Sequence, residues 1–191
     1  MDNGRRIHRV AAWLRELDVK VDVELFASRI KIQKFTYLLG VLLNDRLYDF
    51  GWFTKGPYSK ELTEDYYAGK ELFGKGAGKL NDNEKKEIAR LKNEKMNSLD
   101  PDTLEIMASL YFIMHDETRE KDEETAIKEL MERKPYLELR DIVRGLNALK
   151  EFMLKENDRK KLLSVLEKET EPFERASLSD MNAFSGTSRE E

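Results

Sequence analysis

The sequence predicts a mainly α-helical protein: a helical bundle of six to eight helices around two buried helices, with one short β element near residues 47–54. Three observations lead to this fold class. Apolar residues recur at spacings of three and four along most of the chain, which is the period of an amphipathic helix. Two segments, 35–43 and 104–114, are apolar on nearly every side, which indicates buried helices. Only residues 47–54 alternate with the period of a strand.

The first two helices are expected in residues 5–43. The apolar stripe of the first, residues 5–17, consists of Ile7, Val10, Ala11, Leu14 and Leu17. The second is expected to begin near Asp22, because a carboxylate there suits the N-cap position. It then continues through the apolar segment 35–43, which makes it the first of the two central helices.

Residues 47–66 predict a strand, a tight turn and a helix in succession. The alternation places Tyr48, Phe50 and Trp52 on one face of the strand. Gly56-Pro57 is expected to end the strand, since glycine permits unusual backbone angles and proline begins a new element. Ser59 or a neighbour is expected to cap the helix that follows.

The remaining helices follow from caps and apolar stripes. A charged helix is expected on the surface at 82–96, and Asp100-Pro101 begins the second central helix. Further helices are expected at 122–133 and 139–153, with a short continuation at 162–166. The expected organisation is therefore a single helical domain, residues 1–171, followed by a flexible or partner-docking tail, residues 172–191.

Composition restricts the compartment. Charged residues make up 38% of the 191 residues, there is no cysteine, and Gln33 is the only glutamine. The absence of cysteine favours the cytoplasm, and no stretch approaches the ~20 apolar residues that span a bilayer, so neither secretion nor membrane insertion is expected. A chain rich in Lys, Glu and Arg with so little Gln and Cys is commoner in organisms from hot environments.

The sequence offers no catalytic or metal-binding pattern. His8 and His115 are the only histidines, and neither stands in a paired arrangement that presents metal ligands. No serine lies in a nucleophile elbow such as GxSxG. The sequence therefore predicts a protein that is not an enzyme, without catalytic residues, metal or cofactor.

Aromatic residues are unusually dense in residues 37–67. The cluster consists of Tyr37, Tyr48, Phe50, Trp52, Phe53, Tyr58, Tyr66 and Tyr67. One interpretation is that these rings pack on the two central helices. The other is that part of the set remains open as a groove for a peptide or a stacked base. The residues expected to bind a protein partner in such a groove are Trp52, Tyr58, Ser59, Tyr66 and Tyr67.

Polar residues precede this cluster on the second helix. A lone glutamine at the edge of an apolar run, Gln33, is expected to hydrogen-bond a backbone group of the neighbouring strand or turn. Lys31 and Lys34 flank it. An alternative interpretation combines the two lysines with Arg29, Lys55 and Lys60 as a patch that binds phosphate or an acidic peptide.

The N-terminal third is the basic part of a chain whose net charge is −4. Residues 1–60 contain 11 Lys and Arg against 7 Asp and Glu. Such an excess allows a second function, nucleic-acid binding through the first two helices. The residues expected to contact phosphates are Arg5, Arg6, Arg9, Arg29 and Lys31.

The segment around the aromatic cluster is similar to a known family. Lys31-Ile32-Gln33-Lys34-Phe35-Thr36-Tyr37-Leu38-Leu39, Tyr48-Asp49-Phe50 and Gly56-Pro57-Tyr58-Ser59-Lys60-Glu61-Leu62 follow one another in this order. Over residues 25–70 the chain resembles the YwgA-like family of uncharacterised proteins and, more distantly, the Panacea-domain antitoxins. The residues that carry the structural motif of the resemblance are Lys31, Gln33, Lys34, Tyr37, Gly56 and Pro57.

The resemblance implies a helical, non-enzymatic protein. The more distant resemblance to Panacea-domain antitoxins implies neutralisation of a toxin by direct binding. Together with the aromatic cluster, it predicts a regulatory or protein-interaction module, antitoxin-like or defence-associated, with a protein partner. The alternative is a nucleic-acid-binding transcriptional regulator that uses the basic N-terminal helices. Homo-oligomerisation is left open by the sequence.

Overall fold

The computed structural model describes residues 3–75, 78–117, 120–155 and 158. The chain divides into one compact unit, residues 1–153, and a second unit, residues 154–191. All elements below belong to the first unit. The continuation predicted at 162–166 and the tail predicted at 172–191 lie outside the described residues.

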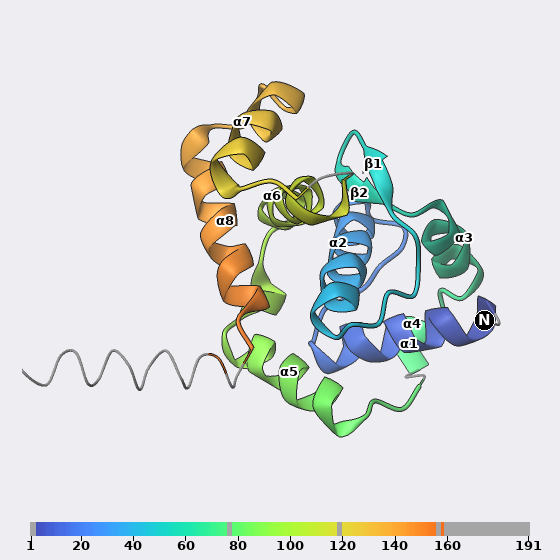
Figure 1. The fold of residues 1–191 in the computed structure, drawn as a ribbon. Coiled ribbons are helices and arrows are strands. Elements are labelled where there is room, and N and C mark those ends of the chain that lie inside the picture. The colour runs from blue at the N-terminus through green and yellow to red at the C-terminus, as the bar shows by residue number, and fades with distance from the viewer. Residues whose placement is uncertain (1–2, 76–77, 118–119, 156–157, 159–191) are drawn as a thin grey trace, which may run out of the picture. The chain divides into compact units, whose positions relative to one another are not determined.

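The predicted fold class is confirmed, because the described chain is mainly helical and contains one small two-stranded antiparallel sheet (Figure 1). The helices are α1 (Asn3–Glu16), α2 (Phe26–Leu42), α3 (Lys60–Ala68), α4 (Leu72–Lys75), α5 (Asp82–Asn93), α6 (Pro101–Tyr111), α7 (Glu123–Arg133) and α8 (Leu139–Met153). The strands are β1 (Gly51–Phe53) and β2 (Gly56–Tyr58). A 3-10 turn at Met96–Ser98 precedes α6, and a π-helical turn at Phe112–Asp116 extends it.

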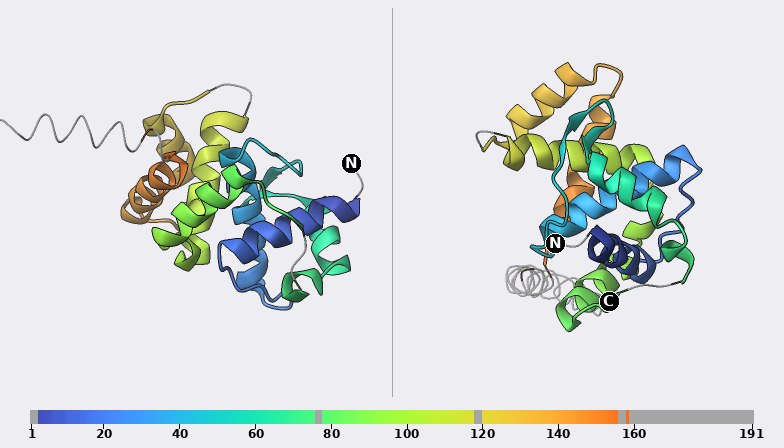
Figure 2. Two further views of the ribbon diagram at one scale, coloured as in Figure 1. Left: turned by 90° about the horizontal axis from the view of Figure 1, so that it is seen from below. Right: turned by 90° about the vertical axis from the view of Figure 1, so that its right-hand side faces the viewer.

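The two helices expected at the centre, α2 and α6, form the core. Both are buried along most of their length, and α6 packs between α2 and α8 (Figures 1 and 2). On the other side of α2, α1 packs against α2, α3 and α5. Since nearly all their side chains are apolar, burial of the two central helices supplies much of the favourable free energy of folding.

The charged helix α5 is less superficial than the sequence predicts. Its inward side buries Ile88 and Leu91, and also the carboxylate of Glu84. That carboxylate accepts a hydrogen bond of 2.8 Å from the indole Nε1 of the fully buried Trp13. Arg90 donates a bond of 2.9 Å to the carbonyl oxygen of Phe152, at the end of α8. The helix buries charged side chains because each of these has a hydrogen-bonding partner.

The β element differs from the prediction in extent. Only Gly51–Phe53 of the expected strand 47–54 is extended and paired, and Gly56-Pro57, expected to end the strand, begins a second one. Phe53 faces Gly56 and Trp52 faces Pro57 in an antiparallel register. Gly56 has φ +76°, which the tight turn requires. Proline is accommodated because alternate antiparallel pairs exchange no backbone hydrogen bonds.

The second helix begins later than predicted. Asp22 does not cap α2; its Oδ1 accepts a bond of 3.0 Å from the amide of Glu24 within a turn. The amide of Asp22 donates to Oγ of Ser28 over 2.8 Å. Leu25 then occupies the N-cap position without a side-chain hydrogen bond. As a result, Leu25 and Phe26 stand exposed at the open end of the helix.

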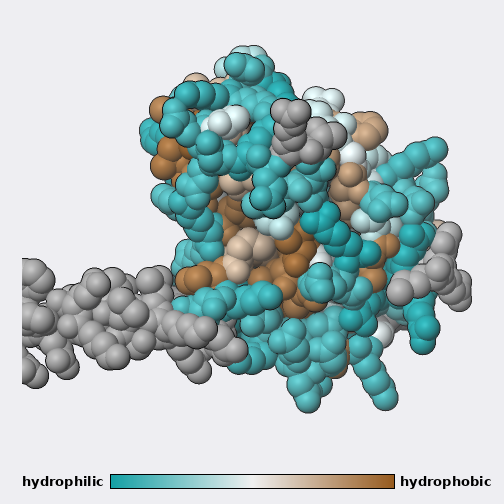
Figure 3. All heavy atoms as spheres, viewed as in Figure 1, coloured by the Kyte–Doolittle hydropathy of each residue, from teal (hydrophilic) through white to brown (hydrophobic). Residues whose placement is uncertain are grey.

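Most of the surface in Figure 3 is hydrophilic, and apolar side chains are visible in the central part of this face. This distribution agrees with the high content of charged residues. Within the described ranges, none of the helices has both the length and the apolar character needed to cross a lipid bilayer.

Candidate functional site

The β1–β2 hairpin and the start of α3 are fastened to α2 by two side chains. The amide of Gln33 pairs with the backbone of Ser59: its Nε2 donates to the carbonyl oxygen, and its Oε1 accepts from the backbone N–H, both over 2.9 Å. This is the backbone contact predicted from the sequence. Lys34 donates from Nζ to the carbonyl oxygen of Pro57 over 2.6 Å. The central helix thereby fixes the position of the hairpin.

Ser59 is a structural residue in this arrangement. It is buried, and its Oγ accepts a bond of 3.4 Å from the amide of Leu62 as the N-cap of α3. The next turn is tied in by Thr63, whose Oγ1 accepts from Nε2 of Gln33 over 2.9 Å and bonds the hydroxyl of Tyr58 over 2.7 Å. Ser59 was predicted to contact a partner, but its hydroxyl is directed to its own helix.

One side of the hairpin is an open groove of about 550 Å³. We call it the aromatic groove and define it by Phe26, Arg29, Lys34, Phe53, Tyr58 and Tyr67, which lie in its walls. Phe26 is 60% exposed, Phe53 57% and Tyr67 46%. The rings of Phe53 and Tyr58 pack together with centroids 4.9 Å apart. Large exposed aromatic side chains around one hollow are typical of binding surfaces.

Two of the residues predicted for the groove have different positions. Tyr66 is only 2% exposed, so it supports the wall beneath Tyr67, whose ring centroid lies 4.9 Å away. Trp52 does not line the groove at all. Tyr66 therefore lines the groove, as predicted, but its ring is buried rather than open, and Trp52 lies on the opposite side of the hairpin. Phe26 and Phe53 take their place as exposed rings.

On the other side of the hairpin, Trp52 is half-buried against the end of α7 and the π-helical turn that follows α6. The guanidinium of Arg133 lies 4.5 Å from the centre of its ring, and Nζ of Lys134 lies 5.5 Å away. The ring of Phe112 is 6.0 Å away. We call this the sealed side of the hairpin. The ring of Trp52 thus makes its cation–π and aromatic contacts within the protein itself.

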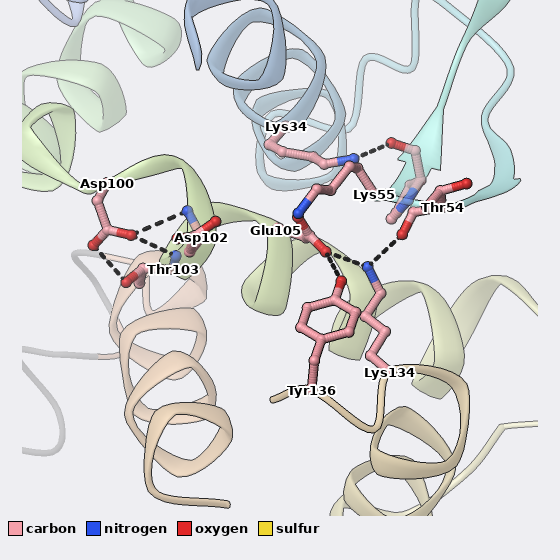
Figure 4. Close-up of polar contacts among 10 residues, drawn as sticks. Lys34, Thr54, Lys55, Asp100, Asp102, Thr103, Glu105, Lys134 and Tyr136 are labelled. Atoms are coloured by element: carbon pink, nitrogen blue, oxygen red, sulfur yellow. Dashed lines mark hydrogen bonds and ion pairs between the residues drawn. The ribbon is translucent and has the colours of Figure 1, made fainter. Parts of the chain in front are cut away.

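A buried ionic cluster joins the sealed side to the groove (Figure 4). Glu105 in α6 forms an ion pair with Lys134 and accepts a bond of 3.0 Å from the hydroxyl of Tyr136. Nζ of Lys55 lies 3.1 Å from its second oxygen. Lys134 also donates over 3.0 Å to the carbonyl oxygen of Thr54 in the hairpin turn. The cluster therefore connects α6, the segment after α7 and the hairpin.

Burial and mutual charge shift the ionisation of these groups. Burial, with the positive charges of Lys134 and Lys55, lowers the pKa of Lys34 to about 7, although Glu105 acts in the opposite direction. Burial alone raises the pKa of Glu105, but hydrogen bonds and charge from Lys134 outweigh it and hold that pKa below its usual range. Burial likewise lowers the pKa of Lys134 despite its contact with Glu105. Lys34 is thus near its titration midpoint at neutral pH.

The arginines predicted to bind nucleic acid are divided between two places. Arg5, Arg6 and Arg9 line a cleft of about 700 Å³ beside α1. Two of them are paired with carboxylates: Arg6 with Glu61 over 2.7 Å, and Arg9 with two acidic residues at 2.5 and 2.8 Å. Arg29 instead lines the aromatic groove, and Lys31 lies half-buried on α2. The structure does not bring the five residues together.

Arg29 is also engaged within its own region. Its NH1 donates to the carbonyl oxygens of Val23 and Glu24 over 2.9 and 3.0 Å. Its guanidinium lies 5.6 Å from the centre of the Phe26 ring. These contacts hold Phe26 in place at the edge of the groove.

Tyr37, in the motif of α2, belongs to a separate network. Its hydroxyl donates to Asp116 over 2.6 Å, and Arg46 binds both oxygens of the same carboxylate at 2.9 and 2.7 Å. This network joins α2 to the π-helical turn that follows α6. His115 beside it is exposed, and nowhere in the described part of the chain do three His, Asp or Glu side chains gather as metal ligands.

Sequence reasoning did not identify Glu105 and Lys134 as neighbours, nor Phe26 as a groove residue. A signal for Glu105 exists, since it is a single carboxylate inside the apolar run of α6 and a buried charge requires a partner. The identity of that partner, 29 positions away, has no local signal.

No protein-family model, curated protein or solved structure matches the chain.

Proposed function

We propose that this protein is a non-enzymatic protein-interaction module that binds a segment of a partner protein in the aromatic groove. The observation that carries the proposal is the exposure of Phe26, Phe53 and Tyr67 around one hollow. Large aromatic side chains lose little conformational entropy on binding and dominate the energetics of many interfaces.

The rigidity of the groove supports the proposal. Its floor is the central helix α2, and Gln33 and Lys34 tie the hairpin to that helix by buried hydrogen bonds. A surface whose side chains are held in place before binding loses less entropy when a partner arrives. The exposed rings stand on a framework that does not need to rearrange.

The ionic cluster beneath the groove is a structural feature in this proposal. A lysine with a lowered pKa is also found in active sites. Lys34, however, is 2% exposed, and its Nζ is directed to the carbonyl oxygen of Pro57. Glu105 is engaged by Lys134, Lys55 and Tyr136. These contacts support a role in fastening the hairpin rather than in a reaction.

The finer assignment, an antitoxin-like or defence-associated regulator in the cytoplasm, rests on the resemblance of residues 25–70 to YwgA-like and Panacea-domain proteins and on the lack of cysteine. In this assignment the groove holds a segment of the toxin. The surface around the groove then determines which partner is neutralised.

A peptide selection tests the proposal. The full chain is immobilised and presented with a displayed library of random twelve-residue peptides, and enriched peptides are measured against Phe53→Ser and Tyr67→Ser. We expect binding to weaken at least tenfold in both variants, since each removes an exposed ring of the groove. Leu139→Ser, which changes an exposed apolar residue of α8 away from the groove, should bind as the native protein does. Equal binding to all three variants, or no enriched peptide, contradicts the proposal.

A second candidate is nucleic-acid binding in the cleft beside α1, favoured by the presence of Arg5, Arg6, His8, Arg9 and Lys79 around it. The carboxylates paired with Arg6 and Arg9 already neutralise part of this charge. Electrophoretic mobility shifts with DNA and RNA at low salt test it, because binding through phosphates weakens steeply as salt rises. A shift that Arg5→Gln weakens supports this candidate, and no shift at low salt rejects it.

A further inference from the structure

The aromatic groove has a charge opposite to that of the chain as a whole. The chain contains 38 Asp and Glu against 34 Lys and Arg. Among the described residues that line the groove, however, the charged ones are Arg29, Lys34 and Lys55, and none is acidic. An apolar hollow with only cations in its walls is complementary to a ligand that is apolar and negatively charged.

The cations at the inner end of the groove are only partly compensated. Lys34 from α2, Lys55 from the hairpin turn and Lys134 from the end of α7 surround one carboxylate, that of Glu105 in α6 (Figure 4). Tyr136, from the segment before α8, adds a neutral hydroxyl. Even with Lys34 only partly protonated at neutral pH, these lysines outweigh the single carboxylate and leave an excess of positive charge.

Lys34 retains donors for a further acceptor. An ammonium group has three N–H donors. The acceptor found for Lys34 among the described residues is the carbonyl oxygen of Pro57. Lys55 pairs with Glu105 and is 40% exposed, so its charge faces both the cluster and solvent. A carboxylate that enters the groove beside these two lysines lowers the cost of keeping them charged.

We infer that the groove selects an acidic segment of a partner protein, with an aromatic or aliphatic side chain among Phe26, Phe53 and Tyr67 and a carboxylate beside Lys34 and Lys55. This inference rests on the proposed function and specifies the chemistry of the partner. The alternation of an apolar anchor and an acidic residue is the recognition signal.

The observations favour a protein segment over a single-stranded nucleic acid. Proteins that bind single strands present a row of cations that follows the phosphate backbone. Here the cations that line the groove are Arg29, Lys34 and Lys55, and the guanidinium of Arg29 already donates to two backbone carbonyls, so the groove does not display a row of cations for successive phosphates. A single carboxylate fits this short stretch of positive charge.

The inference carries a pH dependence. The groups that face Lys34 are Glu105, Lys134 and Lys55, and their effect together with burial sets its pKa at about 7. Only the charged form of Lys34 attracts a carboxylate, while the acidic groups of the partner stay ionised between pH 6 and 8. If the bound complex holds Lys34 charged, affinity falls about tenfold from pH 6 to pH 8. Binding should therefore take up about half a proton at pH 7.

Three displayed peptide libraries test the inference on the full chain. Each combines aromatic and aliphatic residues with one polar set: Asp and Glu, Asn and Gln, or Lys and Arg. We expect the acidic library to be enriched at least tenfold over the other two. Oligothymidylate is added as a competitor, and it should not displace the acidic peptides.

Substitutions then locate the effect. Lys34→Met and Lys55→Met should each weaken binding of the selected acidic peptide about tenfold, and Lys34→Met should also abolish the difference between pH 6 and pH 8. Lys60→Met is the matched control, because this lysine is 84% exposed and does not line the groove. If Lys34→Met fails to fold, as judged by circular dichroism, the comparison of Lys55→Met with Lys60→Met decides whether a groove lysine contributes to binding of the acidic peptide. Equal binding by these two variants then overturns the inference.

The outcomes separate the inference from the proposed function. Groove-dependent binders from the amide library, with affinity equal to that of the acidic ones, overturn the inference while the interaction module stands. So do binders that prefer Lys and Arg, or peptides displaced by oligothymidylate. No groove-dependent binder from any library contradicts the module itself, and the inference fails with it.

Discussion

Trp52 and Phe53 are neighbours in β1 and point to opposite sides of the hairpin, yet only one of the two rings is covered. Trp52 lies beneath Arg133, Lys134 and Phe112 on the sealed side. Phe53 is 57% exposed in the aromatic groove and contacts the ring of Tyr58. The same kind of side chain therefore stabilises the fold on one side and remains available to a ligand on the other.

The difference between the two sides indicates where stability and binding are located. Folding favours covering each large apolar side chain, since each buried ring contributes about 1.5–3 kcal/mol. The sealed side has that cover, and the ionic cluster joins it to the groove. The open side has several uncovered rings in one hollow, which a folded protein seldom exposes without a binding partner. Substitutions on the two sides should separate these roles.

The largest effect is expected from breaking the ionic cluster that joins the sealed side to the groove. Glu105→Ala leaves Lys34, Lys55 and Lys134 close together without their carboxylate. Removing one partner of a buried ionic group costs about 3–5 kcal/mol in the free energy of unfolding. Urea denaturation measures this cost.

Glu124→Ala is the control for Glu105→Ala, because Glu124 pairs with Lys128 on the exposed surface of α7. Its cost should stay below about 1 kcal/mol. Similar losses for the two variants would show that the cluster contributes no more than a surface ion pair.

The next largest effect is expected from removing the hydrogen bonds by which Gln33 ties α2 to the backbone of Ser59. Gln33→Ala leaves the buried N–H and carbonyl of Ser59 without the side chain that bonds them, which should cost about 2–3 kcal/mol. Gln33→Glu keeps an acceptor for the N–H but sets a buried carboxylate against the carbonyl oxygen of Ser59, so it should also destabilise the protein. Lys31→Ala, half-buried on the same helix, is the control. Denaturation curves in which both Gln33 variants match Lys31→Ala would show that these hydrogen bonds do not stabilise the fold.

The direct comparison of the two rings should give a smaller difference. Trp52→Ser removes a half-buried ring that contacts the π-helical turn after α6 and the end of α7, and should destabilise the protein by about 2 kcal/mol. Phe53→Ser removes an exposed ring and should change the free energy of unfolding by less than about 1 kcal/mol. Thermal unfolding followed by circular dichroism measures both. If Phe53→Ser costs as much as Trp52→Ser, the open side is part of the core.

The smallest effect expected is a dependence of stability on pH that comes from Lys34. Its pKa falls from its ordinary value to about 7 on folding, so between these values the unfolded chain binds more protons. Stability must then rise with pH above about 7, by about 1 kcal/mol between pH 7 and pH 8. Urea midpoints at the two pH values measure it, and Lys34→Met should reduce the rise. An unchanged rise in that variant assigns the effect to other groups.

Much of the helical structure was predictable, because it depends on residues close in sequence. Asp100 caps α6 by accepting from the amides of Asp102 and Thr103, and Asp122 caps α7 through Thr125. Both starts follow from cap residues within three positions. The prediction that Asp22 caps α2 is wrong for an equally local reason. Its carboxylate accepts a hydrogen bond from the amide of Glu24, which stabilises a turn and not the first turn of the helix.

The candidate site was only partly predictable. Its position around Gly56-Pro57-Tyr58 and the backbone contact of Gln33 followed from the pattern of residues. The membership of the groove did not, since Trp52 is absent from it, Tyr66 is nearly buried, and Phe26 and Phe53 line it. The second strand was also missed, because a glycine before a proline signals a turn more strongly than a strand.

The sequence by itself determined the helices, their caps and the two apolar segments that become α2 and α6, because spacing and capping act within a few residues. Only the tertiary structure decided which side of the hairpin would be sealed. That choice depends on where α6 and the end of α7 lie, since Lys134 reaches Thr54 across 80 positions and Glu105 across 29. Alternation along β1 sends Trp52 and Phe53 in opposite directions, and the packing of distant segments half-buries Trp52 against the core and leaves Phe53 exposed.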